Sequence, residues 1–159
     1  MKIRVGFGFD VHRQAEGREL WIGGIKLAHT KGLLGHSDAD VLLHAICDAL
    51  LGAANLRDIG FHFPDTAKEY KDVDSKLLLK KTLEVLTEKG YRVGNIDATI
   101  VAERPKINPH VPEMQKVIAE ILEIDVDDIS IKASTSEKIG YVGREEGMTA
   151  YAVALIEKI

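Results

Sequence analysis

Along most of the chain, hydrophobic and polar residues repeat with one of two periods, and the period predicts the local structure. Four segments read as β-strands, most of them by simple alternation: residues 2–9, 96–102, 129–134 and 148–156. Two shorter apolar segments, 20–22 and 25–27, flank Gly23 and Gly24. This arrangement predicts a small hairpin with a two-residue glycine turn in addition to about four main strands.

Three other segments are predicted to be helical. The first is an apolar run that continues from a cap at Ser37 or Asp38 to about Leu51. The second covers residues 75–90, and the third has Pro112 as its first residue, followed by apolar positions at helical spacing. Helices interleaved with strands predict an α+β fold, in the form of a two-layer α/β sandwich with three helices on one face of the sheet.

The last predicted strand is apolar on both of its faces. Three alanines alternate there with larger residues: Ala150, Ala152 and Ala154 against Tyr151, Val153 and Leu155. If helices cover one face of the sheet, the other face needs another partner, so we expect it to be buried between subunits. With 159 residues, of which 45% are hydrophobic, the chain suffices for a single domain, residues 1–159.

A polar stripe runs along the first predicted helix. Asp40, His44 and Asp48 recur at i, i+4 and i+8 and therefore lie on one side, whereas nearly every other residue of this helix is apolar. Each unpaired polar group in such a buried position costs about 2–7 kcal/mol. A metal ion, a charged ligand or a hydrogen-bonded network must therefore compensate the stripe.

Two further candidate ligands follow the first strand. In extended geometry Asp10 and His12 project to the same side at the end of that strand. Together with His44 they form a three-ligand set with an open position, which is typical of catalytic zinc. The alternative is structural, because Asp-x-His is a common tripeptide and a lone helical histidine is usually a satisfied core residue.

Two other segments carry groups that could bind phosphate. His36 and Ser37 precede a helix N-terminus, whose free amides attract anions, although simple capping explains these two residues better when they are taken alone. Near the end of a predicted strand, hydroxyl groups are followed by charged residues, where Glu137 could bind a hard divalent cation. A solvated surface loop is the alternative there. P-loop, His-Glu-x-x-His, Gly-x-Ser-x-Gly and Cys-x-x-Cys motifs are all absent from the sequence.

Charge and composition limit the classes of partner that this protein could bind. The net charge is −4, with charges of both signs interspersed, so no broad basic field is available for nucleic acid or an anionic membrane. The only cysteine, Cys47, leaves no intramolecular disulfide. The N-terminal residues lack the apolar core of a secretory signal, and no run reaches the ~18 apolar residues of a membrane helix. We expect a soluble protein of the cytoplasm.

Assembled in order, these motifs resemble the 2-C-methyl-D-erythritol 2,4-cyclodiphosphate synthase family of the non-mevalonate isoprenoid pathway over essentially the whole chain. The segments that carry the resemblance are 8–12 (Gly-Phe-Asp-Val-His), 31–40, 58–60 with 63–66, 104–106, and 132–138 with Gly143, Arg144 and Gly147. They occur in family order and at near-family spacing. Ser134, Ser136 and Tyr141 differ from the commonest family residues.

The resemblance implies roles for individual residues. Zinc would be held by Asp10, His12 and His44, and His36 and Thr135 would stabilise the phosphoryl transition state. Glu137 would help to hold a second divalent cation, Mg²⁺ or Mn²⁺. The implied substrate-binding residues are Ser37, Asp58, Ile59, Gly60, Phe63, Asp65, Ala102, Pro105, Lys106, Ile107, Ala133, Ser134, Ser136, Glu137, Tyr141 and Arg144.

The resemblance also implies an assembly and a reaction. Family members are homotrimers with active sites between subunits, and Phe9, Tyr141, Arg144 and Glu146 match positions around an axial cavity for an isoprenoid diphosphate. The implied enzyme is a phosphorus–oxygen lyase that converts 4-diphosphocytidyl-2-C-methyl-D-erythritol 2-phosphate, a nucleotide diphosphate, to the 2,4-cyclodiphosphate with release of CMP. Two alternatives are a zinc phosphoesterase of a nucleotide-linked substrate and a trimer that binds an isoprenoid diphosphate and has structural zinc.

Overall fold

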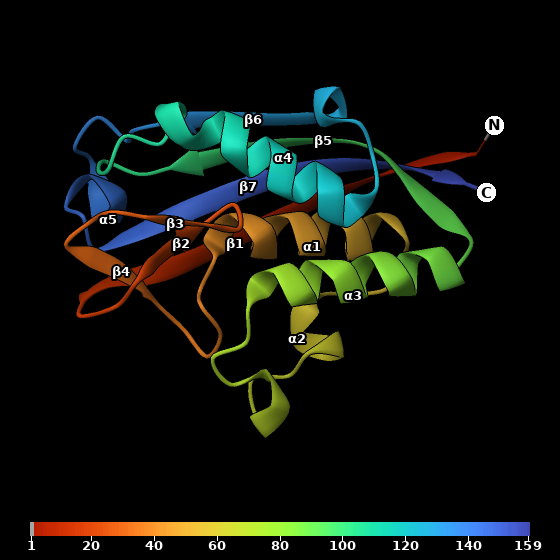
Figure 1. Ribbon diagram of the computed structural model, residues 1–159, viewed down its shortest axis with the longest axis horizontal. Helices are drawn as coiled ribbons and strands as arrows, with labels where there is room; N and C mark the ends of the chain where they lie inside the picture. The colour runs from red at the N-terminus through yellow and green to blue at the C-terminus, as the bar shows by residue number, and fades with distance from the viewer. Residues whose placement is uncertain (1) are drawn as a thin grey trace.

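The computed structural model describes residues 2–159, and five of its strands form one mixed sheet in the order β4-β1-β7-β5-β6 (Figure 1). Their bounds are β1 (Ile3–Glu16), β4 (Lys31–Leu34), β5 (Tyr91–Val101), β6 (Ile129–Ser134) and β7 (Gly147–Lys158). Only the β5–β6 pair is parallel among these neighbours. The predicted hairpin is present as β2 (Leu20–Ile22) and β3 (Ile25–Leu27), with positive φ at both turn glycines.

Three long helices cover one face of the sheet: α1 (Val41–Ala53), α3 (Ser75–Glu88) and α4 (Val111–Leu122) (Figure 1). Two single-turn helices, α2 (Ile59–His62) and α5 (Gly140–Gly143), lie in the connections between the longer elements. Three 3₁₀ turns complete the helical elements of the described chain: Lys68–Tyr70, Asn108–His110 and Val126–Asp128. The predicted α+β class is therefore confirmed.

β1, β5 and β7 are longer than the sequence pattern predicted, whereas β6 has the predicted bounds. β1 continues past residue 9 because its antiparallel pairing with β7 extends to Arg13, and β4, which was not predicted, pairs with the remainder. Asp10 and His12 thus lie inside a strand rather than at its end, although they still share one face. β5 begins at Tyr91 instead of residue 96, since its pairing with β7 begins there.

The predicted cap of the first helix was wrong. Asp40 caps α1, and its carboxylate accepts hydrogen bonds from Leu43 N (3.0 Å), Gly23 N (2.9 Å) and Gly24 N (2.8 Å). One buried carboxylate therefore both starts the helix and attaches the β2–β3 hairpin to it. The third helix also differs slightly, because it begins at Val111 with Pro112 as its second residue.

The α1 helix lies unusually close to β1. A Cβ atom on Gly8 would lie 1.9 Å from the carbonyl oxygen of Ala45, and one on Gly6 would lie 1.9 Å from that of Ala49. Both distances are far below van der Waals contact, so only glycine permits this approach. The side chains that share this face of β1, namely Asp10 and His12, are consequently brought against α1.

The opposite face of the sheet carries no helix and is apolar. Seven large side chains of β1 and β7 are 40–63% exposed there: Ile3, Val5, Phe7, Phe9, Val11, Tyr151 and Val153. Among residues 2–159 there is no helix with the length and apolarity to cross a membrane. An exposed apolar face formed by seven large side chains is typical of an interaction surface.

The close approach of α1 to β1 makes a stability prediction. Gly8→Ala places a methyl group inside the contact distance of the α1 backbone, so we expect it to lower the free energy of unfolding by about 3 kcal/mol or more. Gly52→Ala is the matched control, because Gly52 is exposed in the same helix and its Cβ would have no heavy atom nearer than 4.0 Å. That control should raise the free energy of unfolding by about 0.5–1 kcal/mol. Urea denaturation measures both, and equal stability of Gly8→Ala and wild type would contradict the packing.

Candidate functional site

Asp10, His12 and His44 meet where β1 faces α1. Asp10 Oδ2 lies 2.8 Å from His12 Nε2 and 3.1 Å from His44 Nδ1, and the two histidine nitrogens are 3.2 Å apart. Ligand atoms on a tetrahedral zinc ion with bonds of 2.0–2.1 Å lie about 3.3 Å apart. The three side chains therefore have the donor types and the mutual spacing of a metal-binding triad.

The hydrogen bonds of each imidazole leave one nitrogen free for a metal. His12 Nδ1 donates to the carbonyl of Leu34 at 3.0 Å, so Nε2 presents its lone pair toward Asp10 and His44. His44 Nε2 lies 2.8 Å from Ser75 Oγ and 3.2 Å from Ser37 Oγ, which directs its Nδ1 lone pair to the same point. Both tautomers are thus set by groups behind the histidines.

Ser75 connects His44 to a carboxylate. The Ser75 hydroxyl donates to Asp38, and the Ser75 amide donates to the other oxygen of Asp38 at 2.9 Å. Because the hydroxyl proton is committed to Asp38, Ser75 Oγ accepts the Nε2 proton of His44. The hydrogen bonds from His44 through Ser75 to Asp38 therefore orient the imidazole ring, as carboxylates behind metal-bound histidines do.

The electrostatics favour an ionised carboxylate in the triad. Burial raises the pKa of Asp10, but hydrogen bonds and charge from His12 and His44 outweigh it and lower the pKa to about 2. Burial lowers the pKa of His12, whereas the hydrogen bond and charge of Asp10 raise it, with a net increase. At neutral pH Asp10 is therefore a carboxylate, the form that binds a cation.

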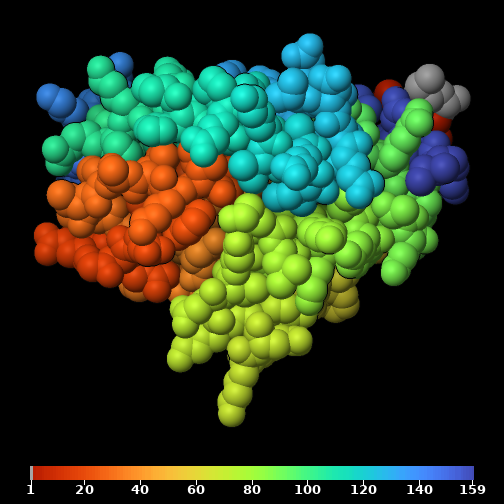
Figure 2. Space-filling view, in the orientation of Figure 1, coloured from red at the N-terminus to blue at the C-terminus, as the bar shows by residue number. Residues whose placement is uncertain are grey.

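A cavity of ≈ 410 Å³ opens over the triad, and the segment between α1 and α3 that forms one of its walls projects from the body of the molecule (Figure 2). His36 lines this cavity, and its Nε2 donates to the carbonyl of Ala67 at 3.3 Å. The sequence-predicted residues that share the cavity are Asp10, His12, His36, Ser37, His44, Ile59, Gly60, Phe63 and Asp65. Asp58 instead caps α2, where it accepts a hydrogen bond from Phe61 N at 2.9 Å.

A second cavity, of ≈ 420 Å³, lies at the ends of β5 and β6. Seven sequence-predicted residues line it: Ala102, Pro105, Lys106, Ile107, Ala133, Ser134 and Thr135. None of the residues that line it also lines the cavity over the triad. Within one chain, the predicted residues therefore form two separate groups rather than one site.

Glu103 organises the loop that follows β6. Its Oε1 accepts hydrogen bonds from Ser136 N (3.1 Å), Ser136 Oγ (3.2 Å) and Lys138 N (3.0 Å). Glu137 and Lys138 both have positive φ, a conformation that costs non-glycine residues of order 1–3 kcal/mol. The Glu103 carboxylate compensates that strain and holds the hydroxyl-rich loop at the rim of the second cavity.

Tyr141 and Arg144, like the predicted residues Asp58, Ser136 and Glu137, line neither cavity. The Tyr141 hydroxyl is hydrogen-bonded to Thr149 Oγ1, and Arg144 Nε pairs with Glu146 Oε1 at 3.2 Å. They lie on and just after α5, between the loop of Glu137 and β7.

The polar stripe of α1 is compensated in three ways. His44 belongs to the triad, Asp40 forms the cap, and Asp48 accepts a hydrogen bond from Ile59 N at 2.8 Å, which attaches α2 to the helix. The sequence therefore indicated correctly that the stripe is compensated, but it did not separate these three roles. Ser75, Asp38 and Glu103 were missed as supporting residues, and no local pattern could have identified them, because their partners are distant in sequence.

Comparison with known proteins identifies the family. The sequence pattern of the YgbB family matches residues 3–157. The chain belongs to the YgbB family. A relative from Bacteroides thetaiotaomicron, named 2-C-methyl-D-erythritol 2,4-cyclodiphosphate synthase, is 72% identical over 158 residues, which cover 99% of each chain. One from Cytophaga hutchinsonii with the same name is 62% identical, with the same coverage. The resemblance indicated by the motifs is therefore confirmed.

Solved structures of similar proteins have the same fold as this chain. The bifunctional IspDF of Campylobacter jejuni superposes with a TM-score of 0.95 at 41% identity, over 99% of this chain and 43% of that longer chain. A 2C-methyl-D-erythritol-2,4-cyclodiphosphate synthase with CDP bound has a TM-score of 0.89 at 32% identity, over 97% of this chain and 100% of the other. The CDP complex of Plasmodium falciparum IspF has a TM-score of 0.86 at 33% identity, over 98% and 96% of the two chains.

The triad predicts metal binding by this YgbB protein. With Zn²⁺ as the probe, we expect about one ion per chain after dialysis, and none in His44→Ala, which keeps its fold because α1 remains packed on β1. His110→Ala is the control, since His110 lies outside the triad and should keep the ion. Elemental analysis with circular dichroism measures both properties. Full zinc occupancy in His44→Ala would rule out this ligand set.

The hydrogen bonds that connect Asp38, Ser75 and His44 predict a second effect on metal binding. Ser75→Ala removes the nearer of the two hydroxyl groups that face His44 Nε2, so we expect zinc affinity to fall about 10–100-fold. Ser130→Ala, at an exposed position of β6, serves as the matched control and should leave affinity unchanged. Competition with a chromophoric chelator gives both dissociation constants. An unchanged constant for Ser75→Ala would mean that Ser75 does not support the metal ligand.

Proposed function

We propose that this protein is a 2-C-methyl-D-erythritol 2,4-cyclodiphosphate synthase, and that the whole chain serves this one catalytic function. The observation that carries the proposal is the triad of Asp10, His12 and His44 at the base of a cavity that His36 also lines. Membership of the YgbB family and the 72% identity to a relative with that name support it.

The proposed reaction is an intramolecular phosphoryl transfer by a phosphorus–oxygen lyase. The 2-phosphate of 4-diphosphocytidyl-2-C-methyl-D-erythritol 2-phosphate attacks the β-phosphorus, a new phosphorus–oxygen bond closes the ring, and the bond to CMP breaks. The nucleophile is already anionic, so the protein mainly folds the substrate back on itself and neutralises charge. His36 and Thr135 are the residues that we assign to the charge of the transition state.

The donor set suggests which metals are used. Two imidazole nitrogens and one carboxylate oxygen suit zinc, and zinc bound there supplies Lewis-acid stabilisation of phosphoryl charge. For the second cation, Mg²⁺ or Mn²⁺, we propose Glu137 as a ligand, because hard cations prefer carboxylate oxygen.

The two cavities suggest how the substrate is divided. We assign the methylerythritol part to the cavity over the triad, with Asp58 at its margin, and the cytidine part to the cavity lined by Ala102, Lys106 and Ala133. The solved relatives that contain CDP support a nucleotide ligand. Ser136 and Glu137 would then contact the diphosphate from the loop that Glu103 holds.

One substrate must bridge two cavities that share no lining residue, and a homotrimer with active sites between subunits meets this requirement. The helix-free apolar face of the sheet supports it, since seven large side chains would otherwise remain in water. Around the trimer axis, Phe9, Tyr141, Arg144 and Glu146 would form a cavity for an isoprenoid diphosphate. The Tyr141 hydroxyl is hydrogen-bonded to Thr149 Oγ1. We further propose a cytoplasmic location.

The test follows the products by phosphorus NMR. Purified protein with 4-diphosphocytidyl-2-C-methyl-D-erythritol 2-phosphate, Zn²⁺ and Mg²⁺ should yield the cyclic diphosphate and CMP together. Chelation and His44→Ala should each abolish the conversion, and added zinc should restore it to the chelated wild type while the far-ultraviolet circular dichroism stays unchanged throughout.

Three results would contradict this function. CMP with a linear bisphosphate would indicate a zinc phosphoesterase. Absence of turnover by protein loaded with zinc would favour a binding trimer. Unfolding on chelation would mark the metal as structural rather than catalytic.

A further inference from the structure

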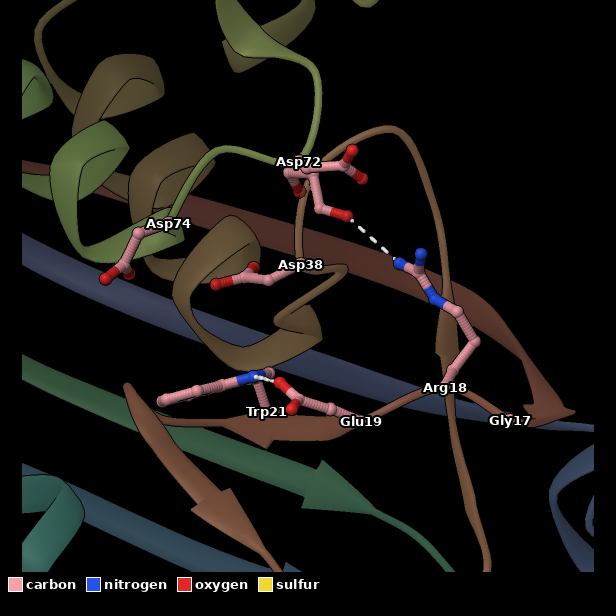
Figure 3. A pocket seen from close by; sticks show the side chains of 8 residues that line it. Gly17, Arg18, Glu19, Trp21, Asp38, Asp72 and Asp74 are labelled. Atoms are coloured by element: carbon pink, nitrogen blue, oxygen red, sulfur yellow. Dashed lines mark hydrogen bonds between the residues drawn. The ribbon is translucent and has the colours of Figure 1, made fainter.

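Arg18 binds the backbone of the segment that carries His36. Its Nε donates to the carbonyl of Leu33 at 3.1 Å, and its Nη2 lies 3.1 Å from the carbonyl of Ser37 and 3.5 Å from that of Gly35. One guanidinium thus contacts three carbonyls within five consecutive residues. Figure 3 shows a third cavity, into which Arg18 extends from the turn between β1 and β2 toward the side where Asp38 and Asp72 lie.

The backbone around Arg18 is built for this contact. Gly17 has a φ of +75° and turns the chain back at the end of β1. A Cβ on Gly32 would lie 2.4 Å from the carbonyl oxygen of Arg18 and 2.2 Å from that of Glu19. The turn therefore packs directly on the β4 backbone. This contact places Arg18 close enough for its guanidinium to reach the segment after β4.

That segment needs an external partner. Residues 35–39 belong to no helix or strand, so sheet and helix hydrogen bonds do not fix their carbonyls. Other backbone bonds attach it only to the segment before α3, from Asp72 N to the His36 carbonyl (2.8 Å) and from Asp38 N to the Val73 carbonyl (3.2 Å). Arg18 is thus the link from this segment to the β1–β2 turn.

We propose that Arg18 is a positioning residue of the active site, which acts by holding the backbone of residues 33–37. The segment presents His36 to the cavity and Ser37 Oγ to Nε2 of the metal ligand His44. Displacement of a catalytic group by 1 Å costs up to about 100-fold in rate. The kinetic part of this inference rests on the proposed function, whereas the structural part does not.

The planar guanidinium is essential to the proposal. Arginine presents several donors in a fixed plane and serves carbonyls in different directions, whereas a lysine ammonium is a compact point charge. Neither Arg18→Lys nor Arg18→Ala should therefore hold the backbone of residues 33–37 in place. Free guanidinium should reach the vacated position in Arg18→Ala, because a cavity of ≈ 370 Å³ adjoins it and is lined by Glu19, Asp38, Asp72 and Asp74.

The test compares wild type, Arg18→Ala and Arg18→Lys, with Glu19→Gln as the control from the same turn and the same cavity. Amide hydrogen exchange should be faster in both Arg18 variants for the peptide of residues 33–40 and unchanged in the control. We expect kcat to fall about 10–100-fold in both variants, with KM nearly unchanged because the nucleotide cavity is intact. Millimolar guanidinium should restore kcat to Arg18→Ala but not to Arg18→Lys.

Different outcomes refute different statements. If residues 33–40 of Arg18→Ala exchange their amide hydrogens at the wild-type rate, the positioning role is overturned, whatever the activity. Altered exchange with unchanged kcat would overturn its importance for catalysis. If kcat falls, guanidinium does not restore it and amide exchange is faster throughout the chain, the variant is generally destabilised. That result would also overturn the positioning role. If wild type fails to form the cyclic diphosphate, the proposed function fails, while the exchange of residues 33–40 still decides whether Arg18 holds the segment.

Discussion

The close contact between the α1 backbone and β1 is the constraint on which the rest of the structure depends. Gly6 and Gly8 remove the side chains that would hold the helix away from the strand. Asp10 and His12 follow on the same face of the strand, so His44 of α1 comes within hydrogen-bond distance of both. The site is thus built on two packed regular elements, the arrangement that positions ligands most accurately.

Charged side chains then fasten the irregular segments to this framework. Asp40 binds the hairpin amides, Arg18 binds one carbonyl of β4 and two of the segment after it, and Glu103 binds the loop after β6. Each side chain satisfies several backbone groups that no helix or sheet provides for. Hydrogen bonds to ionised groups contribute about 1.5–3 kcal/mol each, enough to hold short loops in one conformation.

The division of the predicted residues between two cavities has a consequence for assembly. The proposed substrate has a nucleotide at one end and a phosphorylated polyol at the other, so it must contact both groups of residues at once. The exposed apolar sheet face offers the surface through which copies of the chain would associate, so assembly and site completion have a common explanation in the proposed homotrimer.

The sequence by itself determined the α+β class, the three long helices, the glycine hairpin and the three metal-ligand candidates, because these depend on local periodicity or on motifs of adjacent residues. It misplaced the cap of α1, missed β4 and ended β1 too early, since cap choice and strand length depend on which distant backbone groups become partners. Only the tertiary structure decided that Ser75 and Asp38 support His44, that Arg18 holds the segment of His36, and that Asp40 and Asp48 are structural. The physical reason is that these roles arise from hydrogen bonds between residues far apart in sequence, whose geometry exists only after the helices have packed on the sheet.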